Sequence, residues 1–222
     1  MKILIIPARS GSKRIKNKNI INFFGKPIIS YVIQIAKNSK IFSKIYVSTD
    51  SKKIKKVSEK AGAKVPYLRK KKYSDDTSTM KDALKDFCSK VNFKDDYVCC
   101  IYSTSVLLEK KNFIDAYKKI KNLNFDLIVA IKEFESDPKN ALIIKNKYLR
   151  YDKRKLFFKK KTIKKYSDAG AFFIFKKNSY FKNKYLPKKS TFIELGNLNA
   201  VDVNEKKDLE LLKSIYKGKK CI

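Results

Sequence analysis

The residues best suited to chemistry follow the first apolar segment of the chain, residues 2–7. The loop after it combines one glycine with small hydroxyl residues and cations, in the order Ala8, Arg9, Ser10, Gly11, Ser12, Lys13 and Arg14, followed by Lys18 and Asn19. A short apolar run ending at a proline is typical of a buried parallel strand. Free backbone N–H groups and positive charge at the carboxyl end of such a strand favour a phosphorylated ligand. The loop is neither a Gly-x-Gly-x-x-Gly motif nor a Walker loop, but it predicts a phosphate-binding site.

Two further groups of polar residues stand next to apolar segments. Ser103 and Thr104 follow the apolar run 97–102, either over a ligand crevice or in an ordinary turn. Asp168 stands at the start of the apolar run 169–175, where an unpaired carboxylate would be costly. It serves either a ligand or a structural ion pair with one of the many lysines.

The segments that must position these groups alternate between strand and helix patterns. Apolar spacing predicts strands at 2–7, 44–49, 64–68, 97–102 and 127–131, and helices at 27–38, 51–62, 80–91 and 113–120. Repeated strand–helix units predict an α/β, Rossmann-like fold with a mostly parallel sheet and helices on both faces. After 169–175, a strand at 192–195 and a helix at 205–216 complete one domain spanning residues 1–222.

Residues 136–166 depart from this alternation. Hairpin-like pieces at 142–145 and 148–151 flank an Asn146-Lys147 turn, and a lysine-rich run follows. We interpret the segment as a small β insertion that serves dimerisation, because a monomer would leave its apolar residues partly exposed. The alternative is a solvated loop.

The formal net charge of +33 would give the protein some affinity for any polyanion. Only five of the cations are arginines, whereas base and phosphate recognition favours the bidentate guanidinium. We therefore expect no specific nucleic-acid partner. Three of the five, Arg9, Arg14 and Arg69, fall in candidate phosphate-binding segments.

Membrane and metal signals are weak in this composition. No apolar stretch approaches the roughly twenty residues that span a bilayer, and the first strand is too short for a signal peptide. The four cysteines lack metal-ligand spacing, and the adjacent Cys99 and Cys100 would face opposite sides of a strand. Free buried thiols favour a cytoplasmic protein.

The first loop resembles the signature Ile-Pro-Ala-Arg-x-Gly-Ser-Lys-Arg-Ile-x-x-Lys-Asn-Ile of the cytidylyltransferases that activate nonulosonic acids, the CMP-nonulosonate synthetase family. The resemblance implies a nucleotide-diphospho-sugar transferase fold, a homodimer and transfer of CMP from CTP to the sugar acid with loss of pyrophosphate. It also implies Mg²⁺ as cofactor and assigns the loop residues named above to the nucleotide. Arg9 and Lys13 are then expected to be catalytic.

Two internal segments extend the resemblance. Val65-Pro66-Tyr67-Leu68-Arg69 followed by Ser74-Asp75-Asp76 resembles a family block in which the arginine reaches the nucleotide, so Arg69 is a second phosphate candidate. The two aspartates either cap the next helix or bind a ligand. Residues 99–105 resemble the pseudaminic acid enzymes more than the sialic acid enzymes, and this implies that Ser103 and Thr104 contact the substrate.

Two C-terminal segments complete the resemblance to the family. Residues 166–173 resemble a family element that approaches the sugar, which implies substrate contacts from Asp168, Gly170 and Phe172. Val201-Asp202-Val203-Asn204 aligns with a motif whose two carboxylates bind Mg²⁺, so Asp202 is expected to be catalytic and a metal ligand. Asn204 takes the second ligand position, although an amide is a weaker ligand than a carboxylate.

The function expected from these residues is cytidylyl transfer to a pseudaminic acid-like acceptor. The alternatives are another keto-acid sugar such as an N-acylneuraminate, an impaired relative, or a non-enzymatic polyanion-binding protein. The chain contains no histidine, so a carboxylate, a metal-bound water or the substrate itself would have to accept the proton.

Overall fold

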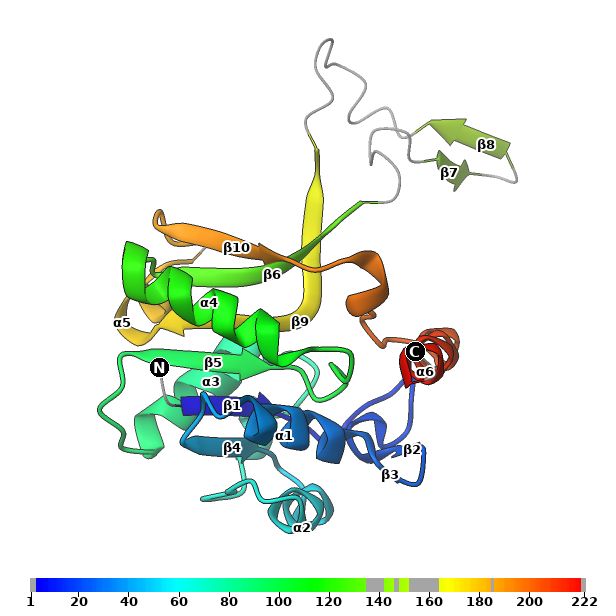
Figure 1. The fold of residues 1–222 in the computed structure, drawn as a ribbon. Helices are drawn as coiled ribbons and strands as arrows, with labels where there is room; N and C mark the ends of the chain where they lie inside the picture. Colours follow the sequence, from blue (N-terminus) through cyan, green and yellow to red (C-terminus); the bar gives the residue numbers. More distant parts are fainter. Residues whose placement is uncertain (1–2, 135–141, 146–147, 152–163, 185, 221–222) are drawn as a thin grey trace.

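The computed structural model describes residues 3–134, 142–145, 148–151, 164–184 and 186–220. Its centre is a six-stranded sheet (Figure 1). The strands are ordered β10-β6-β9-β5-β1-β4, with the bounds β1 Ile3–Pro7, β4 Lys44–Ser48, β5 Tyr97–Ile101, β6 Leu127–Glu133, β9 Tyr166–Lys176 and β10 Ser190–Glu194. All pair in parallel except β9, which lies antiparallel between β5 and β6. The predicted α/β, mostly parallel architecture is confirmed.

Helices cover both faces of the sheet, as the strand sequences require. The bounds are α1 Ile28–Ser39, α2 Lys52–Lys60, α3 Met80–Lys90, α4 Lys110–Leu123, α5 Lys177–Lys182 and α6 Lys206–Lys220. One core cluster joins the sheet to α1, α2, α4 and α6, and the other joins it to α3, with α5 at its margin. In Figure 1, α1 and α4 lie in front of the sheet and α3 lies behind it. Cys99 belongs to the first cluster and Cys100 to the second, as the alternation of side chains along a strand predicted.

Strand β9 contains a bulge where it pairs with β6. Val129 of β6 pairs with Phe173, but Ile131 pairs with Asp168, so β9 carries extra residues between these two positions. Gly170 lies inside the bulge with φ 59°, a backbone conformation that favours glycine. Phe172 pairs with Ile101 of β5 and lies in the first core cluster, where it is 1% exposed and packs against Phe113.

The predicted strand at 64–68 is wrong. This segment runs beside β4 but forms only the isolated bridges Tyr46–Lys64 and Thr49–Leu68. Pro66 stands between them and has no backbone N–H to donate, which interrupts a ladder. The segment still reaches the carboxyl end of β4, where the Arg69 N–H donates to the Thr49 carbonyl at 2.7 Å.

Short elements that the apolar pattern missed surround the first loop. A hairpin of β2 (Asn22–Phe23) and β3 (Lys26–Pro27) precedes α1, and the 3-10 helices are η1 Lys18–Ile20, η2 Lys71–Tyr73 and η5 Asn197–Asn199. Elements of two or three residues are too short to show a hydrophobic period. Within the described residues, no helix has the length and apolar character needed to cross a bilayer.

The expected hairpin in the 136–166 insertion is present as β7 (Leu142–Lys145) and β8 (Tyr148–Tyr151), which pair antiparallel as a separate two-stranded sheet. Figure 1 draws it apart from the main sheet. Residues 135–141, 146–147 and 152–163 lie outside the described part of the chain. The dimerisation role assigned to this insertion therefore stays a prediction.

Candidate functional site

A cleft of about 500 Å³ opens where the carboxyl ends of β1 and β5 meet the start of α3 and the segment before α6. Parallel strands bring their carboxyl ends to one edge of a sheet, and β9, running the other way, brings its first residues to that edge. Five cations and three carboxylates line the cleft: Arg9, Lys13, Arg14, Lys18 and Arg69, with Asp75, Asp76 and Asp202. The other lining residues are Pro7, Ser12, Ile15, Asn19, Tyr73, Ser78, Thr79, Met80, Ala83, Tyr102, Ser103, Thr104 and Asn204.

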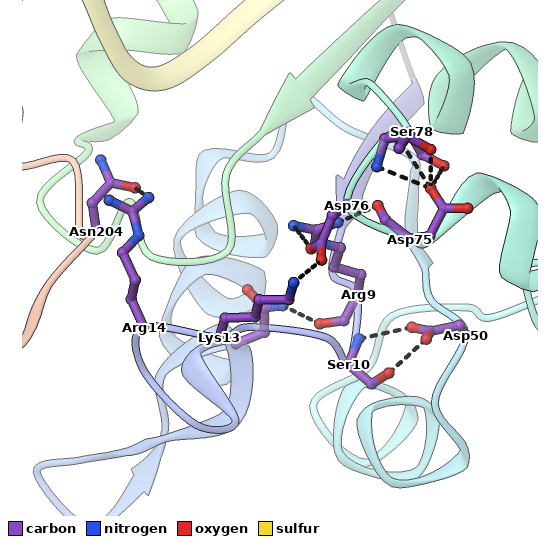
Figure 2. A network of polar contacts seen from close by, with 11 residues as sticks. Arg9, Ser10, Lys13, Arg14, Asp50, Asp75, Asp76, Ser78 and Asn204 are labelled. Carbon is purple, nitrogen blue, oxygen red and sulfur yellow. Dashed lines mark hydrogen bonds and ion pairs between the residues drawn. The ribbon is translucent and has the colours of Figure 1, made fainter.

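Arg9 and Lys13 converge on one carboxylate (Figure 2). Arg9 Nη2 lies 3.2 Å from Asp76 Oδ1, and Lys13 Nζ pairs with Asp76 Oδ2. The hydrogen bond from Lys13 holds the pKa of Asp76 below its ordinary value. Arg9 also donates to the backbone carbonyl of Asp75. The Asp76 carboxylate is thus paired with the two cations that were predicted to bind phosphate.

Neither Asp75 nor Asp76 caps α3. The capping box consists of Thr79 and Asp82, whose side chains each accept from the other's backbone N–H, at 3.1 and 3.0 Å. Asp75 instead closes the turn before the helix, since its Oδ1 accepts from the backbone and side chains of Thr77 and Ser78. Asp76 pairs instead with Arg9 and Lys13, and the ligand alternative for Asp76 stays a prediction.

The first loop is anchored by a residue that the sequence did not single out. Asp50 follows β4 and accepts from the Ser10 N–H at 2.8 Å and from Ser10 Oγ at 2.6 Å. These two bonds fix the start of the loop to the neighbouring strand end (Figure 2). Because β1 and β4 are neighbouring parallel strands, Ser10 and Asp50, which follow them, lie side by side. The distance between the two residues along the chain could not predict this contact.

Lys18 and Asn19 form the inner wall of the cleft. Lys18 Nζ donates to the Val203 carbonyl at 2.7 Å. Burial lowers the pKa of Lys18, and the negative charge of Asp202 partly offsets this lowering. Asn19 is 6% exposed; its Nδ2 donates to the Arg9 carbonyl at 2.7 Å and its Oδ1 accepts from Ser103 Oγ. The side-chain oxygen and nitrogen of Asn19 thus connect the loop after β1 with the loop after β5.

Arg69 lines the cleft from a buried position. It is 5% exposed, its Nε donates to Ser74 Oγ at 2.9 Å and its Nη1 to Ser48 Oγ at 3.3 Å. Burial lowers the pKa of its guanidinium, an effect that nearby Asp50 opposes. Its partners are neutral hydroxyls, so its positive charge is not paired by these bonds.

The C-terminal segment supplies a chain of polar contacts. Asn204 Oδ1 accepts from Arg14 Nη2 at 3.2 Å, and Asn204 Nδ2 donates to Asp202 Oδ2 at 2.7 Å. Asp208 Oδ2 accepts from the backbone N–H groups of Asn204 and Glu205, at 2.8 and 2.7 Å. Asp208 therefore caps α6, and Asp202 is the carboxylate of this segment that lines the cleft.

The predicted substrate residues separate into two groups. Ser103 and Thr104 line the cleft together with Tyr102, whose pKa burial raises. Asp168 does not line the cleft; partial burial and the charge of Asp202 raise its pKa, and its Oδ1 accepts from the Gly170 N–H at 2.8 Å. A Cβ added to Gly170 would stand 2.8 Å from Asp202 Cγ, so this glycine permits a close approach.

Some predicted residues do not line the cleft, namely Ala8, Ser10, Gly11, Asp168, Gly170 and Phe172. The substrate role expected of Phe172 stays a prediction; its side chain lies in the core, 1% exposed, in regular register with Ile101 of β5. Ala8 is 1% exposed and only its backbone is available, its N–H donating to the Ser48 carbonyl at 2.9 Å. Tyr73, Ser78, Thr79 and Met80 line the cleft but were not predicted, because they come from a loop and helix start without a recognisable motif.

Comparison with known proteins agrees with this architecture. A solved CMP:2-keto-3-deoxy-manno-octonic acid synthetase in complex with CTP superposes with a TM-score of 0.75 at 13% identity, covering 98% of this chain and 99% of that one. At that identity the likeness concerns the fold, which is the nucleotidyltransferase fold expected from the first loop.

Sequence comparison identifies the family. The family described as "Cytidylyltransferase" matches residues 3–221. A pseudaminic acid cytidylyltransferase of Campylobacter jejuni is 37% identical over 224 residues, covering 97% of this chain and 96% of the relative. A Helicobacter pylori protein named for that activity and for a hydrolase is 33% identical, covering 90% of this chain and 40% of its own length. The chain therefore belongs to the cytidylyltransferase family, as its N-terminal motif predicted.

Proposed function

We propose that this enzyme transfers CMP from CTP to a nonulosonic acid of the pseudaminic acid type. The observation that carries the proposal is the convergence of Arg9, Lys13, Arg14 and Lys18 in one cleft with Asp202 at its far wall. Four cations suit a triphosphate, whose charge grows on the leaving group during transfer. The full-length similarity to the Campylobacter relative supports the acceptor class.

In the proposed reaction, a hydroxyl oxygen of the sugar acid attacks the α-phosphorus of CTP. The bond between the α-phosphorus and the bridging oxygen breaks, and pyrophosphate leaves with the electron pair. Arg9 and Lys13 would stabilise that leaving group once the phosphates displace Asp76. We assign the hydroxyl proton to Asp202, a carboxylate that lines the cleft, because the chain has no histidine.

The acceptor would bind beside Tyr102, Ser103 and Thr104, which follow β5 and line the cleft. Ser103 Oγ donates to Asn19 Oδ1. One hydrogen bond therefore connects the loop proposed to bind the nucleotide with the residues proposed to bind the acceptor. Lys18 and Arg14 lie between these residues and the C-terminal segment, where a carboxylated sugar would need positive charge.

Magnesium fits this site as an ion that arrives with the nucleotide. Asp202 offers a carboxylate to the cleft, whereas the described residues contain no group of three or more acidic, histidine or cysteine side chains that could hold a metal. Magnesium usually keeps several waters and is bound by one or two carboxylates plus substrate phosphates. When bound it would neutralise charge on the phosphates; Asp202 is the residue that would hold it.

We also propose that the enzyme is a cytoplasmic homodimer. The free thiols of Cys88, Cys99 and Cys100 are consistent with a reducing compartment. The 136–166 insertion, with its separate hairpin, is the segment we assign to the dimer interface.

The test is a matrix of purified CTP, UTP, ATP and GTP against pseudaminic acid, N-acetylneuraminic acid and 2-keto-3-deoxy-manno-octonic acid, followed by pyrophosphate release. We expect turnover with CTP and pseudaminic acid, and CMP-sugar as product by mass spectrometry. Faster turnover with another acid would replace the acceptor but keep the reaction. Salt-dependent binding of nucleic acid without any CTP binding would contradict the proposal as a whole.

A further inference from the structure

Asn204 connects two charged side chains that come from opposite ends of the chain. Its Oδ1 accepts from Arg14 Nη2 at 3.2 Å, across 190 residues, and its Nδ2 donates to Asp202 Oδ2 at 2.7 Å. Arg14, Asp202 and Asn204 all line the cleft. Figure 2 shows the Arg14–Asn204 contact standing apart from the group around Asp76.

An amide is suited to this position because it offers an acceptor and a donor at once. A carboxylate could accept from Arg14 but could not donate to Asp202, and an ammonium group could donate but not accept. The two charged neighbours also determine the orientation of the amide, since oxygen must face the guanidinium and nitrogen the carboxylate. The oxygen that could have bound a metal is already directed at a cation.

We propose that Asn204 is a positioning residue that holds Arg14 and Asp202 apart and keeps both in the cleft, and that it is not a metal ligand. The inference rests on the proposed function only in taking CTP as the ligand. It replaces the second ligand position expected from the sequence motif with a different role for the same side chain.

The backbone around Asn204 is fixed independently of its side chain. The Asn204 N–H donates to Asp208 Oδ2 at 2.8 Å, in the cap of α6, and the preceding carbonyl of Val203 accepts from Lys18 Nζ at 2.7 Å. A change at the side chain should therefore leave the segment in place. This makes the bridge separable from the fold in an experiment.

Removal of the amide should let opposite charges meet. In Asn204→Ala, the Arg14 guanidinium is free to form a direct charge-assisted pair with Asp202, which withdraws it from the triphosphate. In Asn204→Asp, Asp202 loses its donor and gains a like charge next to it, which makes the cleft less favourable for a metal-free triphosphate. Both variants should weaken CTP binding in the absence of metal.

The experiment measures CTP affinity by calorimetry, first in EDTA and then in excess Mg²⁺, for the parent and both variants. Asn197→Asp is the matched control, because it adds the same charge at an exposed position of η5 outside the cleft. We expect Asn204→Ala to bind metal-free CTP about tenfold more weakly, as loss of a hydrogen bond to a charged group predicts. The factor by which Mg²⁺ strengthens binding should stay within about twofold of the parent.

A metal ligand at Asn204 would give the opposite pattern. Asn204→Ala would then leave metal-free CTP affinity unchanged and reduce the strengthening by Mg²⁺, and that result overturns the proposal. A crystal structure of Asn204→Ala gives a second reading that needs no ligand. An Arg14 nitrogen within 4 Å of an Asp202 oxygen supports the bridge, and an Arg14 that keeps its parent position overturns it. Failure of the parent to bind CTP would instead contradict the proposed function.

Discussion

Arg9 and Lys13 are the residues whose charge should matter most for the reaction. Both reach the cleft and both are paired with a carboxylate that a phosphate can displace. We expect Arg9→Ala or Lys13→Ala to lower kcat by about 30-fold or more, since the loss of one contact to a developing anion costs about 2–4 kcal/mol in the barrier. Pyrophosphate release measures the effect.

Lys16→Ala is the control for that pair, because Lys16 belongs to the same loop but is exposed and does not line the cleft. Its turnover and the thermal unfolding of all three variants should match the parent. Activity within a few-fold of the parent for both Arg9→Ala and Lys13→Ala would contradict the assignment of this loop to the nucleotide.

Two glycines near the cleft, neither of which lines it, should respond differently to alanine. Gly170 has φ 59° and an added Cβ would stand 2.8 Å from Asp202 Cγ, so Gly170→Ala should both destabilise the fold and displace Asp202. At Gly11 an added Cβ would meet nothing closer than the Ser74 carbonyl oxygen at 4.0 Å. Gly11→Ala should therefore keep its stability and lose only CTP affinity, if phosphate approaches that backbone.

Urea unfolding and CTP titration, applied to both glycine variants, separate these effects. We expect the free energy of unfolding to fall by at least about 1 kcal/mol for Gly170→Ala, the scale of an unfavourable backbone conformation. A Gly170→Ala protein as stable and active as its parent would show that β9 and the Asp202 segment can move apart.

At the scale of elements, the loop between η2 and α3 places the Asp76 carboxylate against the loop that follows β1. Asp76 pairs with Arg9 and Lys13, so bound phosphates must displace it. Asp76→Asn should therefore tighten CTP binding several-fold at low salt, and the gain should shrink at high salt because exposed charges are screened. Weaker binding by Asp76→Asn would show that this carboxylate contributes to the ligand site instead.

The capping box of α3 gives a pH-dependent prediction. The hydrogen bond from the Thr79 side chain lowers the pKa of Asp82 from its ordinary value of 3.8. A lowered pKa in the folded state means that the box stabilises the protein above pH 3.8, and that this stability is lost as the pH falls through the folded-state pKa. At neutral pH, Asp82→Ala should lower the free energy of unfolding by about 1 kcal/mol, the net contribution of a typical hydrogen bond, because the bond from the Thr79 N–H is lost.

Urea unfolding of parent and Asp82→Ala at pH 7 and near pH 3 checks this direction, and the two proteins should converge in acid. Thr79→Ala removes the other half of the box, so the double variant should lose less than the sum of the two single losses. A difference that grows on acidification would contradict the role of Asp82 as an ionised cap.

At the scale of the whole molecule, the 136–166 insertion should decide the oligomeric state. Its hairpin forms a sheet of its own, separate from the main one. We expect the parent to sediment as a dimer at micromolar concentration and a chain lacking the insertion to be a monomer or to aggregate. A parent that sediments as a monomer would refute this role.

Much of this protein could be predicted from sequence because the relevant signals are local. The apolar run that ends at Pro7 and the basic loop after it are contiguous, so their residue types indicated a phosphate site. The resemblance of the same loop to a known signature indicated the family, which the family comparison confirms. The spacing of apolar residues in α1, α3, β5 and β6 indicates which faces of these elements are buried, and the structure confirms the elements.

Only the tertiary structure decided which distant groups meet and how strands pair. Periodicity records whether a side chain is buried but not which partner buries it, so neither the antiparallel insertion of β9 nor its bulge was predictable. The same limit concealed the Ser10–Asp50 anchor and the pairing of Arg9 and Lys13 with Asp76. The sequence marked Asn204 as an unusual amide in an acidic motif, and its role became visible only when folding brought Arg14 to its oxygen and Asp202 to its nitrogen.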